Sequence, residues 1–424
     1  MTTPTPPQRE LGFGSSGLVS NWWGGLTEEE APDFQFPAAY RTVDKMLTNP
    51  QAAGVFSAIK QMILGTGWRI NGTGCRDDIT HHIAQNMSLP IVGVPDEDGD
   101  TALPVEDRFS WDEHVAVALD DYLRYGHGVF EQQAEQDDAG LWWLARLGWR
   151  SGRTLSRWNT GRNGSLISIE QTPLALGATV LSPGVVSTVT LPIRRLVVYS
   201  RERKGDQWHG ESLLRPAYSP WMLSSRGQRI ELILAERIGS PIPIYEAAPN
   251  EVDLENGRRL AQQVRAGTAA GGATPNGASL RMKGIEGSLP DLDKTIRRHE
   301  ERIAGSMMAN FINLGASSGT GSYALGSVFF NAFLMALQKT AKDIARTASR
   351  HVIGDIVAWN WPGERAPRLE FDEIGARRDA LVQALATLVG AGVLTADQDL
   401  EEFVRSAIGI PALKSPRPAS PVGA

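Results

Sequence analysis

The sequence predicts an α+β protein in which a β-rich module lies between helical segments. Short runs of β-branched and aromatic residues follow one another between residues 129 and 199, separated by Gly, Asn, Asp and Pro. Before and after this stretch, apolar residues recur every three or four positions, which indicates amphipathic helices. A glycine- and serine-rich segment, Leu314–Ser327, separates two of the helical patterns. The 424 residues exceed one typical core, so we expect about two to four domains.

Composition excludes several classes of protein. No apolar run approaches the ~20 residues of a membrane span, so we expect no membrane partner. The polar N-terminus has no secretory pattern, and the single cysteine, Cys75, fits a reducing cytosol rather than a disulfide framework. A net charge of −6 argues against a protein that grips nucleic acid through general electrostatics.

The first part of the chain is predicted to be an arm followed by helices. Residues 1–35 are rich in Pro, Gly and Ser, and we expect a flexible arm. Helices are predicted at 49–64, 77–87 and 111–125, with a strand at 68–70. The adjacent pair His81 and His82 has no carboxylate or cysteine at metal-ligand spacing, so we expect it on a solvated helix face.

The β-rich module and the segments after it are predicted from turn and cap signals. The expected strands are Val129–Gln133, Trp142–Arg146, Leu155–Trp158, Ser165–Glu170, Val186–Leu191 and Leu196–Tyr199. Ser219 followed by Pro220 predicts a helix start, and that helix runs to about Ile238. A small αβ unit follows, with a strand at 242–245, a helix at 252–265 and a returning strand at 279–282.

The last third of the chain is predicted to be mostly helical. A helix over 292–313 leads into the glycine-serine segment, and a second helix covers 327–359, roughly 50 Å at 1.5 Å per residue. Residues 375–410 are predicted to form a helical pair, stopped and restarted at Gly390 and Thr395.

No enzyme signature is present. The chain has no GxxxxGK[ST] phosphate loop, and Gly210-Glu211-Ser212 lacks the second glycine of a nucleophile elbow. We therefore predict no catalytic, cofactor-binding or metal-binding residues and no cofactor. Four basic residues on the predicted helix before the glycine-serine segment are interleaved with acidic ones: Lys294, Arg297, Arg298 and Arg302. Two interpretations stay open, namely ion pairs along an exposed face and a charged face that meets other subunits or a polyanion.

Three fragments together carry a family resemblance. They are the helix from Asn49 ending before Trp68-Arg69-Ile70, the run Tyr125–Glu131, and the run Trp208–Tyr218. In this order they resemble the portal proteins of tailed bacteriophages, and the resemblance covers roughly residues 40–410.

The resemblance implies a portal-like architecture. Its parts would be a flexible arm (1–35), a β-rich wing (36–210), a first stem helix (211–240), a small αβ clip (241–289), a second stem helix (290–313), a tunnel loop (314–326), a spine helix with a following strand (327–374), a short helical crown (375–410) and a flexible tail (411–424).

The resemblance also implies a function. Portals form a homo-oligomeric ring, commonly of twelve copies, at one capsid vertex of the virion, after assembly in the host cytoplasm. Double-stranded DNA passes through the ring non-specifically during packaging and ejection, and ATP is spent by the terminase. The implied partners are the terminase large subunit, the major capsid protein and the head-tail adaptor or neck proteins. The alternatives are another capsid-associated protein, such as a minor head protein or neck adaptor, and an unrecognised nuclease or hydrolase.

The glycine-serine segment would be the DNA-facing loop of such a ring. Its glycines give backbone freedom and its hydroxyls offer sequence-independent contacts to phosphates. The expected residues are Gly315, Ser317, Ser318, Gly319, Thr320, Gly321, Ser322 and Tyr323. The alternative is an ordinary linker between two helices. Lys294, Arg297, Arg298 and Arg302 are the charged candidates of the stem.

Overall fold

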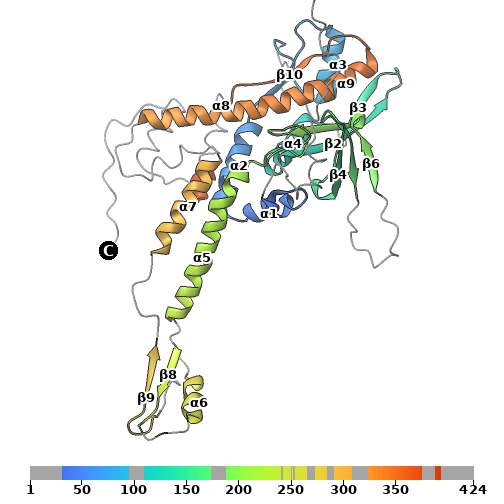
Figure 1. Ribbon diagram of the computed structural model, residues 1–424. Helices are drawn as coiled ribbons and strands as arrows, with labels where there is room; N and C mark the ends of the chain where they lie inside the picture. Colours follow the sequence, from blue (N-terminus) through green and yellow to red (C-terminus); the bar gives the residue numbers. More distant parts are fainter. Residues whose placement is uncertain are drawn as a thin grey trace, which may run out of the picture. The chain divides into compact units, whose positions relative to one another are not determined.

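The computed structural model describes residues 31–94, 109–172, 188–239, 242–249, 251, 254–264, 273–283, 291–307, 323–374 and 387–392. The chain divides into two compact units (Figure 1). The first joins Met1–Tyr218 to Ile303–Ala424, and the second is Ser219–Arg302. Helices and strands occur in both units, as the α+β prediction requires.

The first unit begins with four helices and a short strand. They are α1 (Ala39–Met46), α2 (Pro50–Leu64), β1 (Trp68–Asn71), α3 (Asp77–Met87) and α4 (Trp111–Arg124). The Asn49 side chain caps α2 by accepting a hydrogen bond from the Ala52 amide at 3.1 Å. The predicted elements are confirmed here, and α1 is an additional helix that the sequence pattern did not predict.

Two three-stranded antiparallel sheets follow, and all six predicted strands are present. One sheet has the order β3 (Trp142–Trp149), β2 (His127–Gln136), β7 (Leu196–Ser200). The other has the order β4 (Leu155–Thr160), β5 (Leu166–Gln171), β6 (Val189–Pro192). Apolar residues from both sheets share one core cluster: Val129, Leu155, Leu166, Ile169, Leu191, Leu196 and Val198. Alternating side chains of the strands therefore build a sandwich-like core.

The predicted long helix is present, with two differences. The first helix, α8 (Tyr323–Ala348), starts at Tyr323 rather than at Ser327, and a π-turn at Ser349–Ile353 joins it to α9 (Gly354–Asn360). The Ser349 hydroxyl donates to the Ala345 carbonyl and accepts from the Leu369 amide at 2.9 Å. The Ser349 side chain therefore connects the π-turn to β10 (Arg368–Phe371), which is the strand predicted after the helix. β10 pairs antiparallel with β1.

The outer edge of β3 is closed by two asparagine side chains. Asn86 of α3 accepts from the Leu144 amide at 2.9 Å and donates to the Leu144 carbonyl at 3.1 Å. Asn360 of α9 makes the same pair of bonds to Trp142, at 2.7 and 2.8 Å. Each amide thus replaces one residue of a neighbouring strand, which protects an edge that would otherwise expose backbone donors and acceptors.

One histidine expectation was wrong. His82 does not lie on a solvated face but is 7% exposed, with its ring 4.0 Å from that of Trp143 and 5.2 Å from that of Trp361. Its Nε2 also bonds the Trp142 carbonyl at 3.1 Å. His81 is exposed, as expected. The two neighbours differ because consecutive helix positions point about 100° apart.

The second unit contains most of two helices and, between them in the sequence, a small αβ element. α5 (Tyr218–Gly239) precedes β8 (Ile242–Glu246), α6 (Glu255–Gln263), β9 (Ser279–Lys283) and α7 (Leu292–Ser306) (Figure 1). β8 and β9 pair antiparallel, and Gly257 of α6 sits so close to the Tyr245 ring that a Cβ would lie 2.1 Å from it.

Two predicted helix limits need correction. A 3-10 turn, Arg215–Ala217, leads directly into α5 at Tyr218, so Ser219 lies inside the helix and does not cap it. The helix of the αβ element starts at Glu255 rather than at Val252. Of the predicted helical pair, the structure describes only helical residues 387–390 and the turn at 391–392.

Candidate functional site

Two of the fragments that carry the resemblance meet at one backbone junction in the first unit. Gly126 has φ +87°, and a Cβ on it would stand 2.6 Å from the Glu211 carbonyl carbon. Gly210 has φ +59°, and a Cβ there would stand 2.4 Å from the carbonyl oxygens of both Arg201 and Gly126. The Arg201 amide donates to the Gly126 carbonyl, and the Glu211 amide donates to the Arg201 carbonyl. Only glycine allows so close an approach with positive φ.

The same junction satisfies the C-terminal end of α4. The last carbonyls of a helix have no partner within it. Here the Leu213 amide donates to the Leu123 carbonyl at 2.9 Å, and the Ser212 hydroxyl donates to the Arg124 carbonyl. The Leu214 amide in turn donates to the Ser212 hydroxyl at 3.1 Å. Ser212 of the elbow-like Gly210-Glu211-Ser212 sequence is buried. Its hydroxyl forms hydrogen bonds to backbone groups on both sides, so its role is structural.

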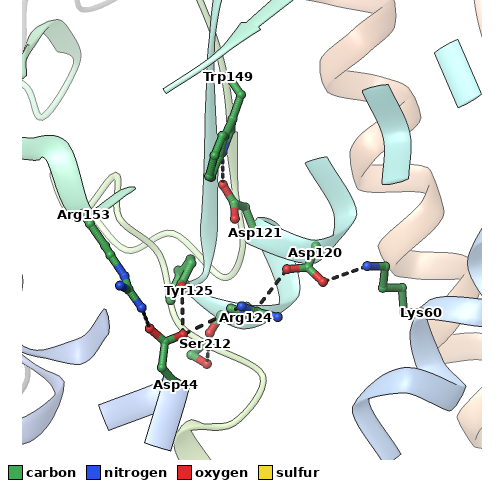
Figure 2. Close-up of polar contacts among 9 residues, drawn as sticks. All are labelled: Asp44, Lys60, Asp120, Asp121, Arg124, Tyr125, Trp149, Arg153 and Ser212. Carbon is green, nitrogen blue, oxygen red and sulfur yellow. Dashed lines mark hydrogen bonds and ion pairs between the residues drawn. The ribbon is translucent and has the colours of Figure 1, made fainter. Parts of the chain in front are cut away.

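An ionic network surrounds the last turn of α4 (Figure 2). The Arg124 guanidinium lies 3.2 Å from Asp120 and 3.8 Å from Asp44 of α1, while Lys60 of α2 contacts Asp120 at 2.8 Å. Asp44 also accepts from the Tyr125 hydroxyl at 2.8 Å and pairs with Arg153. These pairs are partly exposed, so each contributes modestly, but together they tie α1 and α2 to α4.

Two buried groups next to this network have shifted pKa values. Burial raises the pKa of Asp121 to about 6, while its hydrogen bond from the Trp149 indole at 2.6 Å acts in the opposite direction. Burial lowers the pKa of His127 to about 4. Both ring nitrogens of His127 are within 2.7 Å of a partner, the Tyr40 hydroxyl and the His209 carbonyl. The neutral imidazole thus connects α1 to the turn before α5.

The charged candidates of α7 divide into two kinds. Arg297 forms an i,i+4 ion pair with Asp293 at 3.0 Å, which is the first of the two interpretations. Lys294, Arg298 and Arg302 are exposed and follow one another at intervals of four residues. Within the described residues, none of these three has an ion-pair partner within 4.0 Å. Like charges at this spacing repel one another, and each pair costs about 0.2–0.5 kcal/mol.

The positive row also affects a neighbouring histidine. His299 is 8% exposed, and its pKa is lowered by burial and then by the charges of Arg298 and Arg302. The positive charges of Arg298 and Arg302 therefore add to burial in disfavouring protonation of His299.

A part of the α5 surface outside its contacts with α7 carries exposed apolar side chains around the exposed Arg226. α5 meets α7 through Gln228, which donates to Glu300 at 3.0 Å, and through Gly227, which faces Ile296. At 100° per residue, four large side chains fall within about 100° on another part of the helix surface. They are Met222 (44% exposed), Leu223 (42%), Ile230 (43%) and Ile233 (42%).

The structure leaves most of the expected DNA-facing loop undescribed. Gly315, Ser317, Ser318, Gly319, Thr320, Gly321 and Ser322 lie outside the described residues. Tyr323 is not in a loop, because it is the first residue of α8. The expected loop therefore ends before Tyr323, because α8 begins four residues earlier than the predicted start at Ser327.

The described residues lack two further kinds of site. No three His, Cys, Asp or Glu side chains gather there as metal ligands do. None of the described helices combines the length and apolar character that crossing a bilayer requires.

Comparison with known proteins identifies the family. The family described as "Portal protein of Mu bacteriophage" matches residues 40–410. This chain belongs to that portal family. A search of curated proteins found no match.

Solved structures are similar to this chain at low sequence identity. The chain is similar to one from the neck of an empty gene transfer agent particle, with 14% identity and a TM-score of 0.51, covering 94% of this chain and 100% of that one. It is also similar to an HK97-family phage portal protein from Corynebacterium diphtheriae, with 13% identity and a TM-score of 0.42, covering 80% and 96%.

The sequence pattern missed several residues that build this portal junction. Gly126, Gly210 and Ser212 were named only within the resemblance and, for the last two, a rejected nucleophile elbow, because their contacts join positions more than eighty residues apart. Asp44 was missed together with α1. The local signal in the sequence was glycine itself at both positions, which the structure explains by their positive φ.

Proposed function

We propose that this chain is the subunit of a portal ring at one capsid vertex. The ring serves as a conduit for double-stranded DNA during packaging and ejection, and as a docking platform for other parts of the particle. Its expected partners are further copies of itself, the terminase large subunit, the major capsid protein and head-tail adaptor proteins. The family match over residues 40–410 carries this proposal. The neck particle among the similar structures supports a position at the portal vertex.

The exposed apolar face of α5 supports assembly into a ring. A long helix that leaves Met222, Leu223, Ile230 and Ile233 in solvent is unusual for a monomer, and burying such a face against another copy stabilises an oligomer. In this proposal α5 and α7 are the stem helices, and the element of β8, α6 and β9 is the clip. The first unit then holds the wing, with α8 and α9 as its spine.

Electron microscopy of the purified protein tests the proposal. We expect rings with a central channel, whereas filaments or monomers would contradict it. Replacing Ile230 and Ile233 together with Asp places two charges in the proposed contact and should yield monomers. Ser225→Asp is the matched control, because it adds a charge to the same helix outside the apolar face and should leave rings intact.

The row of Lys294, Arg298 and Arg302 supports contact with DNA. A conduit should not bind DNA tightly, because each phosphate contact adds affinity and slows movement. In a chain of net charge −6, three positive side chains along one helix provide local guidance without a general grip. Arg297 is not part of this row in the proposal, because its charge is paired with that of Asp293.

The segment Gly315–Ser322 is proposed as the tunnel loop, between α7 and α8. Its glycines and hydroxyls suit weak contacts with passing phosphates. Deleting Ser317–Ser322 should lower DNA packaging or retention while rings still assemble. Normal packaging by this deletion would contradict the assignment.

A further inference from the structure

A cavity of about 430 Å³ lies beside the junction, between the start of α1 and the turn that precedes α5. Aromatic rings form part of its wall: Phe36 stacks on His209 with an interplanar angle of 12°, and its centroid lies 5.8 Å from that of Tyr40. Polar groups of the same wall are already paired, since the Tyr40 hydroxyl bonds His127. A volume of this size accommodates one or two large side chains or a small ligand.

The charges at the cavity are arranged around two carboxylates and several cations. Glu202 pairs with Lys339, and Glu211 lies 4.0 Å from Lys204. Arg215 also lines the cavity, and its guanidinium lies 4.7 Å over the ring of Phe34. Each of these two carboxylates therefore has a lysine beside it, and the Arg215 guanidinium contacts the ring of Phe34.

The described chain begins at this cavity. The Phe34 amide donates to the Ala31 carbonyl at 2.9 Å, and Phe34 and Phe36 both line the cavity. The thirty residues before Ala31 lie outside the described part. They include Glu28, Glu29 and Glu30, which immediately precede Ala31, and the adjacent pair Trp22 and Trp23.

Position, charge and chain length agree on one occupant. The acidic run Glu28–Glu30 ends four residues before Phe34 in the sequence, and the ring of Phe34 contacts the Arg215 guanidinium. The eight residues from Trp23 to Ala31 span at most about 27 Å, enough to reverse direction and reach the cavity. An indole combines a large apolar area with one N–H donor, which suits a cavity with aromatic walls and polar groups.

We propose that the segment Trp22–Glu30 of the same chain folds back into this cavity, with Trp22 or Trp23 as its anchor. The segment then braces α1 against the turn Lys204–Pro216 and so stabilises the junction that leads into α5. The proposal is independent of the portal function, because it concerns packing within one subunit.

Disulfide trapping in the full-length protein tests it. In a Cys75→Ser background, Trp23→Cys is combined with Gln207→Cys, which lines the cavity. Mild oxidation should give a disulfide within one chain, seen as thiols protected from alkylation at unchanged subunit mass on a non-reducing gel. The control pair is Trp23→Cys with Glu135→Cys, at an exposed position on β2, and it should oxidise much more slowly.

The other outcomes overturn the proposal. Covalent dimers would mean that the segment of a neighbouring copy fills the cavity. Equal rates for the two pairs, or no disulfide, would mean that the segment does not dock there.

Hydrogen exchange provides a second measurement. Trp22→Ala with Trp23→Ala should speed exchange of the Glu211 and Leu213 amides, which bond across the junction, by roughly 5- to 30-fold. Phe13→Ala removes an aromatic ring nine residues before Trp22, outside the proposed segment, and should leave these rates unchanged. Unchanged exchange in the double variant would also overturn the proposal.

Discussion

Gly126 and Glu211 contact each other through their backbones, at a separation that leaves no room for a side chain on residue 126. The contact joins the start of β2 to the turn that leads into α5. Because Gly210 approaches the Gly126 carbonyl from the same turn, neither glycine can change alone without moving the other strand of chain. The junction therefore holds the turn before α5 in close backbone contact with the start of β2 in the sandwich-like core.

Gly126→Ala should strongly destabilise the protein. The substitution combines a positive φ, costing about 1–2 kcal/mol, with overpacking that costs about 1–3 kcal/mol. Gly140→Ala is the matched control, because Gly140 has φ +83° but its nearest atom to a Cβ is 3.7 Å away. Urea unfolding should show a decrease of about 2–5 kcal/mol for Gly126→Ala and only the backbone cost for Gly140→Ala. Equal decreases would show that the close contact with Glu211 has no energetic effect.

Asn86→Leu and Asn360→Leu should differ although both asparagines make the same pair of bonds to β3. Asn86 is 8% exposed, so its replacement leaves the Leu144 amide and carbonyl buried without partners, at about 1–3 kcal/mol each. The bonds of Asn360 are exposed, and water can replace them. We expect a decrease of about 2–5 kcal/mol for Asn86→Leu and less than about 1 kcal/mol for Asn360→Leu in equilibrium unfolding.

His127→Gln should make the protein less sensitive to acid. In the unfolded chain His127 binds a proton below its ordinary pKa of 6.5, whereas in the folded chain its pKa is about 4. The unfolded state therefore holds more protons in this window, and the free energy of unfolding falls by about 1.4 kcal/mol for each pH unit below 6.5. Unfolding measured between pH 7 and pH 4.5 should show a slope shallower by that amount in the variant. An identical slope would mean that His127 is protonated in the native protein.

Asp121→Asn should have the opposite effect. The folded pKa of Asp121 is raised to about 6 from 3.8, so the native state takes up this proton first as the pH falls. Protonation of Asp121 thus favours folding progressively from pH 6 down to about pH 4, at about 1.4 kcal/mol per pH unit. The variant lacks this stabilising proton uptake, so its free energy of unfolding should decrease more steeply as the pH falls from 6 to 4. Its amide oxygen still accepts from Trp149, so the packing is preserved and fluorescence of the folded state should be nearly unchanged at pH 7.

Replacing Lys294, Arg298 and Arg302 together with Gln should weaken non-specific DNA binding by assembled rings. The salt dependence of binding should become shallower, by about 0.9 in the logarithmic slope for each phosphate that these side chains no longer neutralise. Arg297→Gln is the control and should change the slope little, because Asp293 already pairs with Arg297. If the triple variant kept the wild-type slope, the row would lie away from DNA.

The sequence predicted regular elements better than contacts between them. The bounds of α3 were predicted because Asp77 and Asp78 begin a helix whose apolar residues recur at helical spacing. α1 was missed because it has only eight residues, its N-cap Ala38 offers no side-chain cap, and it follows a segment that contains prolines. Its role depends on distant partners, such as Arg124 for Asp44.

The candidate site could be predicted only in part for the same reason. Lys294, Arg298 and Arg302 were found because their spacing is a local property of one helix. The π-turn was not found, because its Ser349 contact comes from Leu369 after the helix has ended. Likewise, His82 was misjudged although Ile79 and Ile83 beside it indicated a buried face.

The pairing of β1 with β10 has a consequence for synthesis. β1 is made early, at Trp68–Asn71, but its partner strand ends at Phe371, so the whole Ser219–Arg302 unit must be translated in between. A chain that stops before Arg368 lacks this partner, and Trp68 then has no Phe371 opposite it. The first unit is therefore completed only after the whole second unit has been translated, and a truncated chain would leave β1 without its partner strand.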